Sequence, residues 1–252
     1  NITRKNYSKK IFNLLNKKKI YFIDTAYSYK NAEKTLGKFN LKKFKIISKL
    51  PNIQKNHAID EIENIVTKYV RLSLEKLKIK KFYALLVHNT RELNGKKGAK
   101  IFNTLKKLKK RHMVDKIGYS IYSPSELDKY FQKFKPDIVQ GPLNLLDQRI
   151  LEGGWLKKLK INGIEFHARS IFLQGLLLKN LRKMPKKFRK YQTIFRKYCT
   201  WLQKNNLSSF DACLNFIYSI KFANKVVIGV DNDKQLKKII NFLPDKKKYN
   251  FS

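Results

Sequence analysis

The sequence contains few residues of several kinds, and each shortage excludes a class of protein. Only two cysteines, Cys199 and Cys213, occur among 252 residues. They cannot form a framework of disulfides, and their spacing matches no zinc motif. No apolar run approaches the ~20 residues that span a bilayer, and no apolar segment follows the early lysines as it would in a signal peptide. No linker rich in Gly, Pro or Ser divides the chain. We therefore expect one domain, without a metal site, in a reducing, cytoplasmic setting.

Acidic residues are scarce as well: 18 Asp and Glu stand against 57 Lys and Arg, so the formal net charge is +39. A basic field attracts phosphates, and one interpretation is a binder of nucleic acid or an anionic membrane. The other is a lysine-biased composition, since Lys far outnumbers Arg and a phosphate-binding surface usually employs more Arg. The densest basic runs, 106–111 and 179–190, lack the interleaved aromatic residues of a single-strand platform. We expect neither nucleic acid nor a membrane as partner.

Short apolar runs alternate with longer helical patterns along the chain. Hydrophobic residues make up 42% of it, enough to bury a core despite the charge. Continuous apolar strands separated by helices are typical of parallel strands buried on both faces. About seven such units at regular spacing favour a (β/α)8 TIM barrel over an open sheet. We expect strands at 21–25, 45–49, 82–87, 116–120, 138–140, 163–170 and 226–229, and helices at 8–18, 58–77, 97–110, 191–204, 209–220 and 233–242.

One further helix is expected to begin with Ser123 as its N-cap and Pro124 at its first position. No strand is followed by G-x-G-x-x-G, which weakens the alternative of an open dinucleotide-binding sheet.

Polar residues follow three consecutive predicted strands. Asp24, with Tyr27 and Tyr29 nearby, ends the first, Lys49 the second and His88 the third. Functional residues of a (β/α)8 barrel sit at these carboxyl ends. Each residue also has a structural interpretation: Asp24 as a loop cap, Lys49 as one lysine among many, His88 as a core histidine. Their convergence on one cleft favours function.

The chemistry of this set is coherent. An ammonium near a tyrosine stabilises the phenolate and lowers the phenol pKa from its usual value of about 10. A buried lysine needs a carboxylate to remain charged, because desolvation disfavours the cation. Asp24 would hold Lys49, Lys49 would tune a tyrosine, and His88 would orient a carbonyl oxygen. Such a site would donate a proton to a carbonyl that accepts a hydride.

These residues resemble the signature of the aldo-keto reductases. The family pattern DTAxxYGxSExxLG is similar to DTAYSYKNAEKTLG at residues 24–37, with Lys30 and Ala32 in place of Gly and Ser. The resemblance continues in the family's order over nearly the whole chain, through residues 47–50, 73–77, 85–88, 116–120, 139–144, 168–175 and 228–236.

The resemblance implies roles for individual residues. Tyr29 would be the general acid, tuned by Lys49 and Asp24, and His88 would orient the substrate; the spacing from Asp24 selects Tyr29 over Tyr27. The reaction implied is NAD(P)H-dependent reduction of an aldehyde or ketone, or its reverse, with NADP expected and NAD left open. The implied cofactor-binding residues are Ser120, Gln140, Arg169, Ser170, Phe172, Gly175, Gly229, Val230 and Gln235.

Departures from the family pattern bear on these roles. Arg169 stands where an aromatic residue commonly stacks on the nicotinamide, a role that a planar guanidinium can also fill. Ile121 replaces a frequent Asn, and Gln235 a frequent Arg. Residues 1–7 are too short and polar to supply the family's first strand. We therefore expect a single barrel domain over 1–252 that lacks its first strand, and additional N-terminal residues in the full gene product.

One alternative function and the nature of the substrate stay open at this point. The barrel could be a non-catalytic, cofactor-binding regulatory or scaffold protein, because a fold hosts many functions. Polar and charged residues at 143–149 and 167–170 suggest a polar or anionic carbonyl substrate, such as a sugar derivative. The sequence does not determine the oligomeric state.

Overall fold

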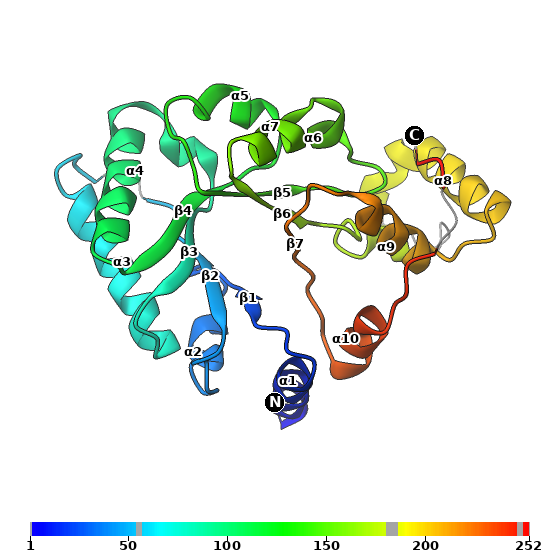
Figure 1. Ribbon diagram of the computed structural model, residues 1–252, viewed down its shortest axis with the longest axis horizontal. Coiled ribbons are helices and arrows are strands. Elements are labelled where there is room, and N and C mark those ends of the chain that lie inside the picture. The colour runs from blue at the N-terminus through cyan, green and yellow to red at the C-terminus, as the bar shows by residue number, and fades with distance from the viewer. Residues whose placement is uncertain (1, 54–56, 180–185, 246–248, 252) are drawn as a thin grey trace.

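The computed structural model describes residues 2–53, 57–179, 186–245 and 249–251. Within these ranges seven strands form one sheet whose spatial order follows the sequence, and every neighbouring pair is parallel. The sheet curls as in a barrel (Figure 1). Its strands are β1 (Phe22–Asp24), β2 (Lys45–Lys49), β3 (Phe82–Val87), β4 (Val114–Ser120), β5 (Ile138–Pro142), β6 (Glu165–Arg169) and β7 (Lys225–Val226).

The ring of strands is open between β7 and β1, each of which pairs with one neighbour in the described part of the chain. Residues that precede β1 form a helix, α1 (Ile2–Lys17), which packs beside α10 (Asp233–Ile240). The fold is thus the predicted (β/α)8 type with seven of its strands, and the described residues hold no strand ahead of β1.

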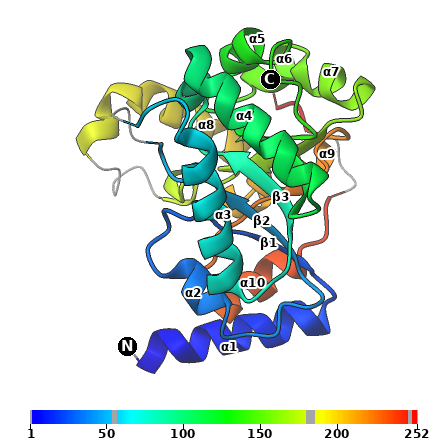
Figure 2. The ribbon, with the colours of Figure 1, turned by 90° about the vertical axis from the view of Figure 1, so that its left-hand side faces the viewer.

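Helices cover the outer face of the sheet. Figure 2 shows α3 (Ile62–Leu77) and α4 (Gly95–Lys110) side by side over the first strands. On α3 the buried residues Ile62, Val66, Val70 and Leu77 recur at helical spacing and form the stripe that faces the sheet. The remaining helices are α2 (Ala32–Leu36), α5 (Ser125–Tyr130), α6 (Arg149–Glu152), α7 (Trp155–Ile161), α8 (Gln192–Lys204) and α9 (Ser209–Ser219), with 3-10 turns η1 (Thr90–Leu93), η2 (Leu176–Leu178) and η4 (Lys186–Tyr191).

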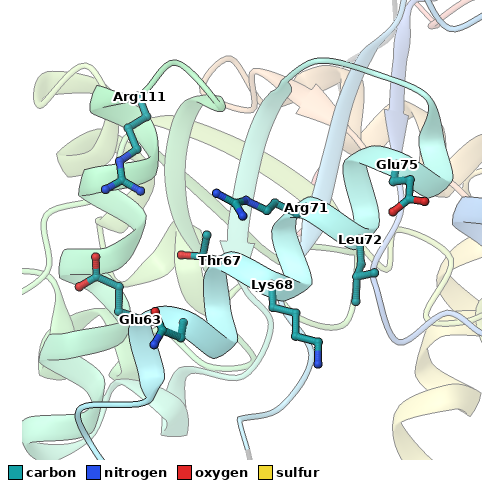
Figure 3. Close-up of a pocket in the computed structure, with 8 residues that line it drawn as sticks. Glu63, Thr67, Lys68, Arg71, Leu72, Glu75 and Arg111 are labelled. Atoms are coloured by element: carbon teal, nitrogen blue, oxygen red, sulfur yellow. The ribbon is translucent and has the colours of Figure 1, made fainter.

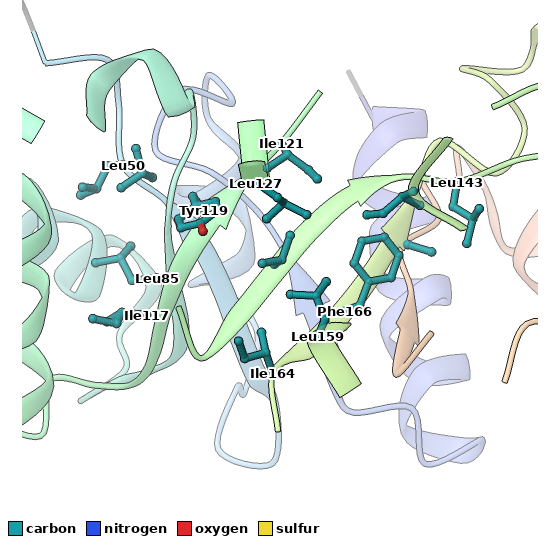
Figure 4. Packing of buried hydrophobic residues seen from close by; sticks show 14 of the residues in the cluster. Leu50, Leu85, Ile117, Tyr119, Ile121, Leu127, Leu143, Leu159, Ile164 and Phe166 are labelled. Atoms are coloured by element: carbon teal, nitrogen blue, oxygen red, sulfur yellow. The ribbon is translucent and has the colours of Figure 1, made fainter. Parts of the chain in front are cut away.

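The main core lies between the strands and this helical layer. Leu85, Ile117 and Phe166 pack there with Leu159 of α7 (Figure 4). A second, smaller cluster that includes Ile47, Leu86 and Ile138 fills the inner face. Adjacent residues such as Leu85 and Leu86 therefore serve opposite faces, which explains the continuous apolar strands. Each fully buried side chain of this size contributes about 1.5–3 kcal/mol.

Several predicted boundaries were wrong, and local contacts explain two of them. The cap expected from Ser123 does not form: α5 begins at Ser125, and the carboxylate of Glu126 accepts the backbone N–H groups of Tyr122 and Ser123 at 2.9 and 3.0 Å. The helix expected from 58 begins at Ile62, because Glu61 accepts the N–H of Ala58 at 3.0 Å and closes a turn ahead of it.

The strand expected over 226–229 is Lys225–Val226; Val227 still donates its N–H to the Ala168 carbonyl oxygen at 2.7 Å, and residues 228–230 lie outside the strand. Half of the second basic run, residues 180–185, and residue 1 lie outside the described ranges. Among the helices that the structure describes, none combines the length and apolarity needed to cross a membrane.

Candidate active site

The carboxyl ends of β1 and β2 bring Asp24 and Lys49 together. The Lys49 ammonium forms an ion pair with Asp24 and donates to the carbonyl oxygen of Thr25 at 3.0 Å. Gln140, in the middle of β5, donates its amide to the other Asp24 oxygen at 2.7 Å. Only 2% of the Lys49 side chain is exposed, and this burial lowers the pKa of Lys49 while the Asp24 charge opposes the shift. The buried cation thus has the carboxylate partner that the sequence predicted.

Tyr29 and His88 complete a compact group with this pair. The Lys49 Nζ lies 5.4 Å from the centroid of the Tyr29 ring, and the Tyr29 and His88 rings meet edge to face at 5.8 Å. His88 Nδ1 is 3.3 Å from the hydroxyl of Ser28. Tyr29 is 46% exposed, so a ligand can reach it. The structure therefore brings all four predicted catalytic residues to one end of the barrel.

Tyr27 points elsewhere. Its ring packs edge to face on Tyr69 of α3 at 4.8 Å, and the Lys76 ammonium lies 4.1 Å from its centroid. The two tyrosines, two residues apart, therefore have different surroundings, and only Tyr29 faces Lys49 and His88.

The pKa of Tyr29 moves in the direction opposite to the one expected from a nearby ammonium. Burial raises it above its usual value of 10.0, the Asp24 carboxylate raises it further, and the Arg169 charge acts against both. Sequence reasoning considered Lys49 alone and missed the effects of burial, of the Asp24 charge and of the Arg169 charge on the pKa of Tyr29. Burial, followed by the Lys49 charge, lowers the pKa of His88 below 6.5. At neutral pH the phenol therefore keeps its proton and the imidazole is neutral.

The rest of the 24–37 motif holds the loop in place. Glu33 is buried, and its carboxylate accepts hydrogen bonds from Ser48 at 2.8 Å and from Ser73 at 2.9 Å. A side chain on Gly37 would place its Cβ 1.9 Å from the carbonyl oxygen of Lys76, so α2 approaches α3 only because this residue is Gly. Lys30, at the family's Gly position, has φ of +44° in the left-handed region. These residues fix the path of the chain that carries Tyr29.

A cleft of about 870 Å³ opens beside Asp24 and Tyr29 and runs towards the amino ends of α9 and α10. This volume lies within the range of about 300–1,000 Å³ typical of cofactor sites. The predicted cofactor residues that line it are Gln140, Arg169, Ser170, Phe172, Gly175, Gly229, Val230 and Gln235. Ser120 does not line it: this serine is buried at the end of β4, where it pairs in register with Gln140.

Sequence reasoning missed a second group of lining residues. Ser208, Ser209 and Phe210 enter from the start of α9, and Asp231 and Lys238 from the region of α10. The Ser208 hydroxyl accepts the Asp211 N–H at 3.1 Å, an N-cap that the Ser-Ser-x-Asp spacing signals. The Lys238 ammonium lies 4.2 Å from the Phe210 centroid. The cleft thus offers hydroxyl, amide and cationic groups along its length, a donor set that fits a dinucleotide.

The loop after β6 has the backbone shape of a tight ligand-facing turn. Ser170, Leu173, Gln174 and Gly175 all have positive φ, from +47° to +80°. The Asn144 amide donates to the Ser170 carbonyl oxygen at 3.2 Å and ties this loop to the end of β5. These conformations bend the chain sharply, and Ser170, Gln174 and Gly175 of the loop line the cleft.

Arg169 is held in this cleft by three contacts. Its Nη2 donates to the Ile121 carbonyl oxygen at 2.8 Å and its Nη1 to the Ser170 hydroxyl at 3.2 Å. Its Cζ lies 4.6 Å from the centroid of the Tyr122 ring. One face of the guanidinium is therefore covered by Tyr122, and a nicotinamide would have to stack on the other.

Another hollow, of about 490 Å³, lies on the outer surface of α3 near Arg111 (Figure 3). Glu63 at its edge is paired with Lys107 at 2.6 Å and with Lys100 at 3.5 Å. None of the predicted site residues lines it, and it lies away from the strand ends. Within the described ranges there is no group of three or more His, Cys, Asp or Glu side chains placed to hold a metal ion.

The model of the aldo/keto reductase family matches residues 2–249. No curated protein matches the chain. Similar solved structures include the holo form of aldo-keto reductase AKR11C1 from Bacillus halodurans, with a TM-score of 0.75 and 16% identity over 96% of this chain and 84% of that one. Glycerol dehydrogenase AKR11B4 from Gluconobacter oxydans has a TM-score of 0.71 and 19% identity over 96% and 82%. Identities this low show likeness of fold alone.

Proposed function

The chain belongs to the aldo/keto reductase family, and from that premise we propose that it interconverts an aldehyde or ketone and its alcohol, with Tyr29 as the general acid. Membership of the family makes it an oxidoreductase that acts on small carbonyl compounds. The observation that carries the finer proposal is the group of Asp24, Tyr29, Lys49 and His88 at one end of a dinucleotide-sized cleft.

Each member of this group has a task in the reaction. A bound nicotinamide dinucleotide supplies the hydride. Tyr29, protonated at neutral pH, donates its hydroxyl proton to the carbonyl oxygen as negative charge develops there. His88, neutral in the same range, donates a ring N–H hydrogen bond that orients that oxygen. Lys49 stabilises the phenolate that remains, and Asp24 keeps Lys49 charged and in position.

The cleft residues suggest how a dinucleotide would lie. Gln140 and Arg169 stand beside Asp24 at the reacting end, Ser170 to Gly175 form the middle, and Gly229, Val230 and Gln235 form the far end. We propose NADP as the dinucleotide, because the Lys238 ammonium at the far end suits a phosphate. The Asp231 carboxylate at the same end would repel that phosphate, and NAD, which lacks it, is therefore the alternative. Fluorescence titration of the protein with each dinucleotide decides between them: tighter binding of NAD would contradict the preference.

The catalytic proposal is tested with the two neighbouring tyrosines. Consumption of the reduced dinucleotide is followed with a panel of aldehydes for the unmodified protein, Tyr29→Phe and Tyr27→Phe. We expect Tyr29→Phe to lose activity by about 10²–10⁴-fold, the contribution of a positioned acid. Tyr27→Phe, which keeps its ring on Tyr69, should remain within a few-fold. Equal turnover in Tyr29→Phe and the unmodified protein would remove Tyr29 from the mechanism. Binding of the dinucleotide without turnover of any carbonyl would favour the regulatory alternative.

We also propose a cytoplasmic location, which two unpaired cysteines, Cys199 and Cys213, support. Detection of the protein outside the cytoplasm by fractionation would contradict it.

A further inference from the structure

Arg169 is a half-buried cation that has no carboxylate partner in the described part of the chain. Two of its N–H groups are used, by the Ile121 carbonyl and the Ser170 hydroxyl, and the Tyr122 ring covers one face. A guanidinium has five N–H donors in a fixed fork. The contacts therefore fix its orientation and leave other N–H donors on a side chain that lines the cleft.

The other charges near Tyr29 are already balanced. Lys49 is paired with Asp24, and the pKa of His88 lies below 6.5, so the imidazole is neutral at pH 7. The Arg169 charge lowers the pKa of Tyr29, Lys49 and His88 alike. It favours the phenolate of Tyr29 and disfavours the protonated forms of Lys49 and His88. The reacting end of the cleft thus carries one uncompensated positive charge, and this charge belongs to Arg169.

A nearby arginine, Arg149, provides a contrast to Arg169 because it has a carboxylate partner. The Arg149 guanidinium binds both oxygens of Asp147, at 2.8 and 2.9 Å, and reaches the Tyr122 carbonyl oxygen at 3.4 Å. Arg149 and Arg169 therefore flank the same residue, but only Arg149 has its own carboxylate.

Burying a cation without an anion costs free energy, and an anionic ligand in the cleft would recover it. The fork of a guanidinium matches a carboxylate or a phosphate through paired hydrogen bonds. We propose that the carbonyl substrate carries an anionic oxygen group, a carboxylate or a phosphate, which binds Arg169 while its carbonyl group faces Tyr29. This inference rests on the proposed function and names the substrate class of the same site.

The first test compares anionic and neutral aldehydes of similar shape. One pair is 4-formylbenzoate and 4-formylbenzamide; the other is glyceraldehyde 3-phosphate and glyceraldehyde. For the unmodified protein, kcat/KM should favour the anionic member of at least one pair, and the responding pair identifies carboxylate or phosphate. In Arg169→Gln that preference should fall by about tenfold or more, the effect of losing a charged hydrogen bond. Taking the ratio within each pair removes general losses of activity.

Arg149→Gln is the matched control, because it removes the same charge beside the same tyrosine but a charge that Asp147 already neutralises. The preference of Arg149→Gln for the anionic aldehyde should stay within about twofold of that of the unmodified protein, since a paired exposed charge contributes little. Arg169→Lys keeps the charge but not the planar fork, so its preference for the anionic aldehyde should lie between those of Arg169→Gln and Arg149→Gln. This variant replaces Arg169→Gln in the test if Arg169→Gln fails to fold. A preference that is absent in the unmodified protein, or equal in Arg169→Gln and Arg149→Gln, overturns the proposal.

A binding measurement separates this proposal from the catalytic one. With the dinucleotide present, benzoate should raise the melting temperature of the unmodified protein more than benzamide does, or sodium phosphate more than sodium chloride, and the difference should vanish in Arg169→Gln. This result supports the anion site even if no aldehyde is reduced. Equal shifts within both comparisons overturn the anion site even if aldehydes are reduced.

Discussion

Removing the Lys49 ammonium should unfold the protein at lower denaturant concentration, because it leaves the Asp24 carboxylate without its cation. Breaking a buried pair in this way costs about 3–5 kcal/mol. The Asp24 side chain is 13% exposed and keeps the Gln140 amide at 2.7 Å, so some of its charge remains solvated. We therefore expect Lys49→Met to cost about 3 kcal/mol.

A double variant tests whether the uncompensated charge is the cause. Asp24→Asn in the Lys49→Met background removes that charge and retains an oxygen for the Gln140 amide. It should recover about 2 kcal/mol, and the remaining ~1 kcal/mol reflects the lost hydrogen bonds. Lys81→Met is the matched surface control: its 2.8 Å pair with Asp115 is exposed, so its loss should cost less than ~1 kcal/mol.

Urea unfolding followed by the fluorescence of Trp155 and Trp201 measures these differences. For a chain of this size, 3 kcal/mol corresponds to a melting temperature lower by about 6–12 °C. Carbonyl reduction should be lost in both the single and the double variant, since neither retains the ammonium. A double variant as unstable as Lys49→Met would refute the reasoning.

Three further predictions follow from single residues. Burial alone raises the pKa of Glu165, but hydrogen bonds from His167, Lys116 and Tyr83 outweigh it and hold the value at about 2, below the usual 4.5. The stability that Glu165 contributes should therefore be present above pH ~4.5 and lost as the pH falls towards ~2, with a slope of up to ~1.4 kcal/mol per pH unit that Glu165→Gln lacks; equal slopes in urea melts would contradict this. Lys30→Gly should raise the free energy of unfolding by about 0.5–1 kcal/mol because φ of Lys30 is +44°. Lys30→Ala keeps the Cβ and should not raise it; equal unfolding midpoints for the two variants would show that the backbone at residue 30 is not strained. Since the pKa of Tyr29 lies above 10.0, kcat/KM for reduction should be flat from about pH 7 to 9, and a falling limb with an apparent pKa below ~9 would show that Tyr29 is not the acid.

Some parts of this fold and site were predictable from the sequence because they depend on periodicity and local motifs. The apolar runs place β2 and β3 and hence Lys49 and His88 at neighbouring strand ends. The spacing within 24–37 distinguishes Tyr29 from Tyr27, and the structure gives the two rings different surroundings.

Other features depend on contacts between distant segments, and the sequence alone could not predict them. The raised pKa of Tyr29 reflects burial, the Asp24 charge and the Arg169 charge together. Ser208 and Lys238 line the cleft because α9, which packs on η2 after β6, and α10, which packs on α1, both border it. The N-terminus of α5 was mispredicted because Pro124, not Ser123, takes the N-cap position, and the Glu126 carboxylate within the helix accepts the Ser123 N–H.

The central claim is that this cleft carries out hydride transfer to a carbonyl carbon while Tyr29 supplies the proton. Its most direct test uses a reduced dinucleotide deuterated at the transferring position of the nicotinamide, with an accepted aldehyde, and analysis of the alcohol by mass spectrometry. The account predicts one deuterium on the former carbonyl carbon, formed by the unmodified protein and by Tyr27→Phe but not by Tyr29→Phe. An alcohol without deuterium, or labelled alcohol formed equally fast by Tyr29→Phe, would contradict it.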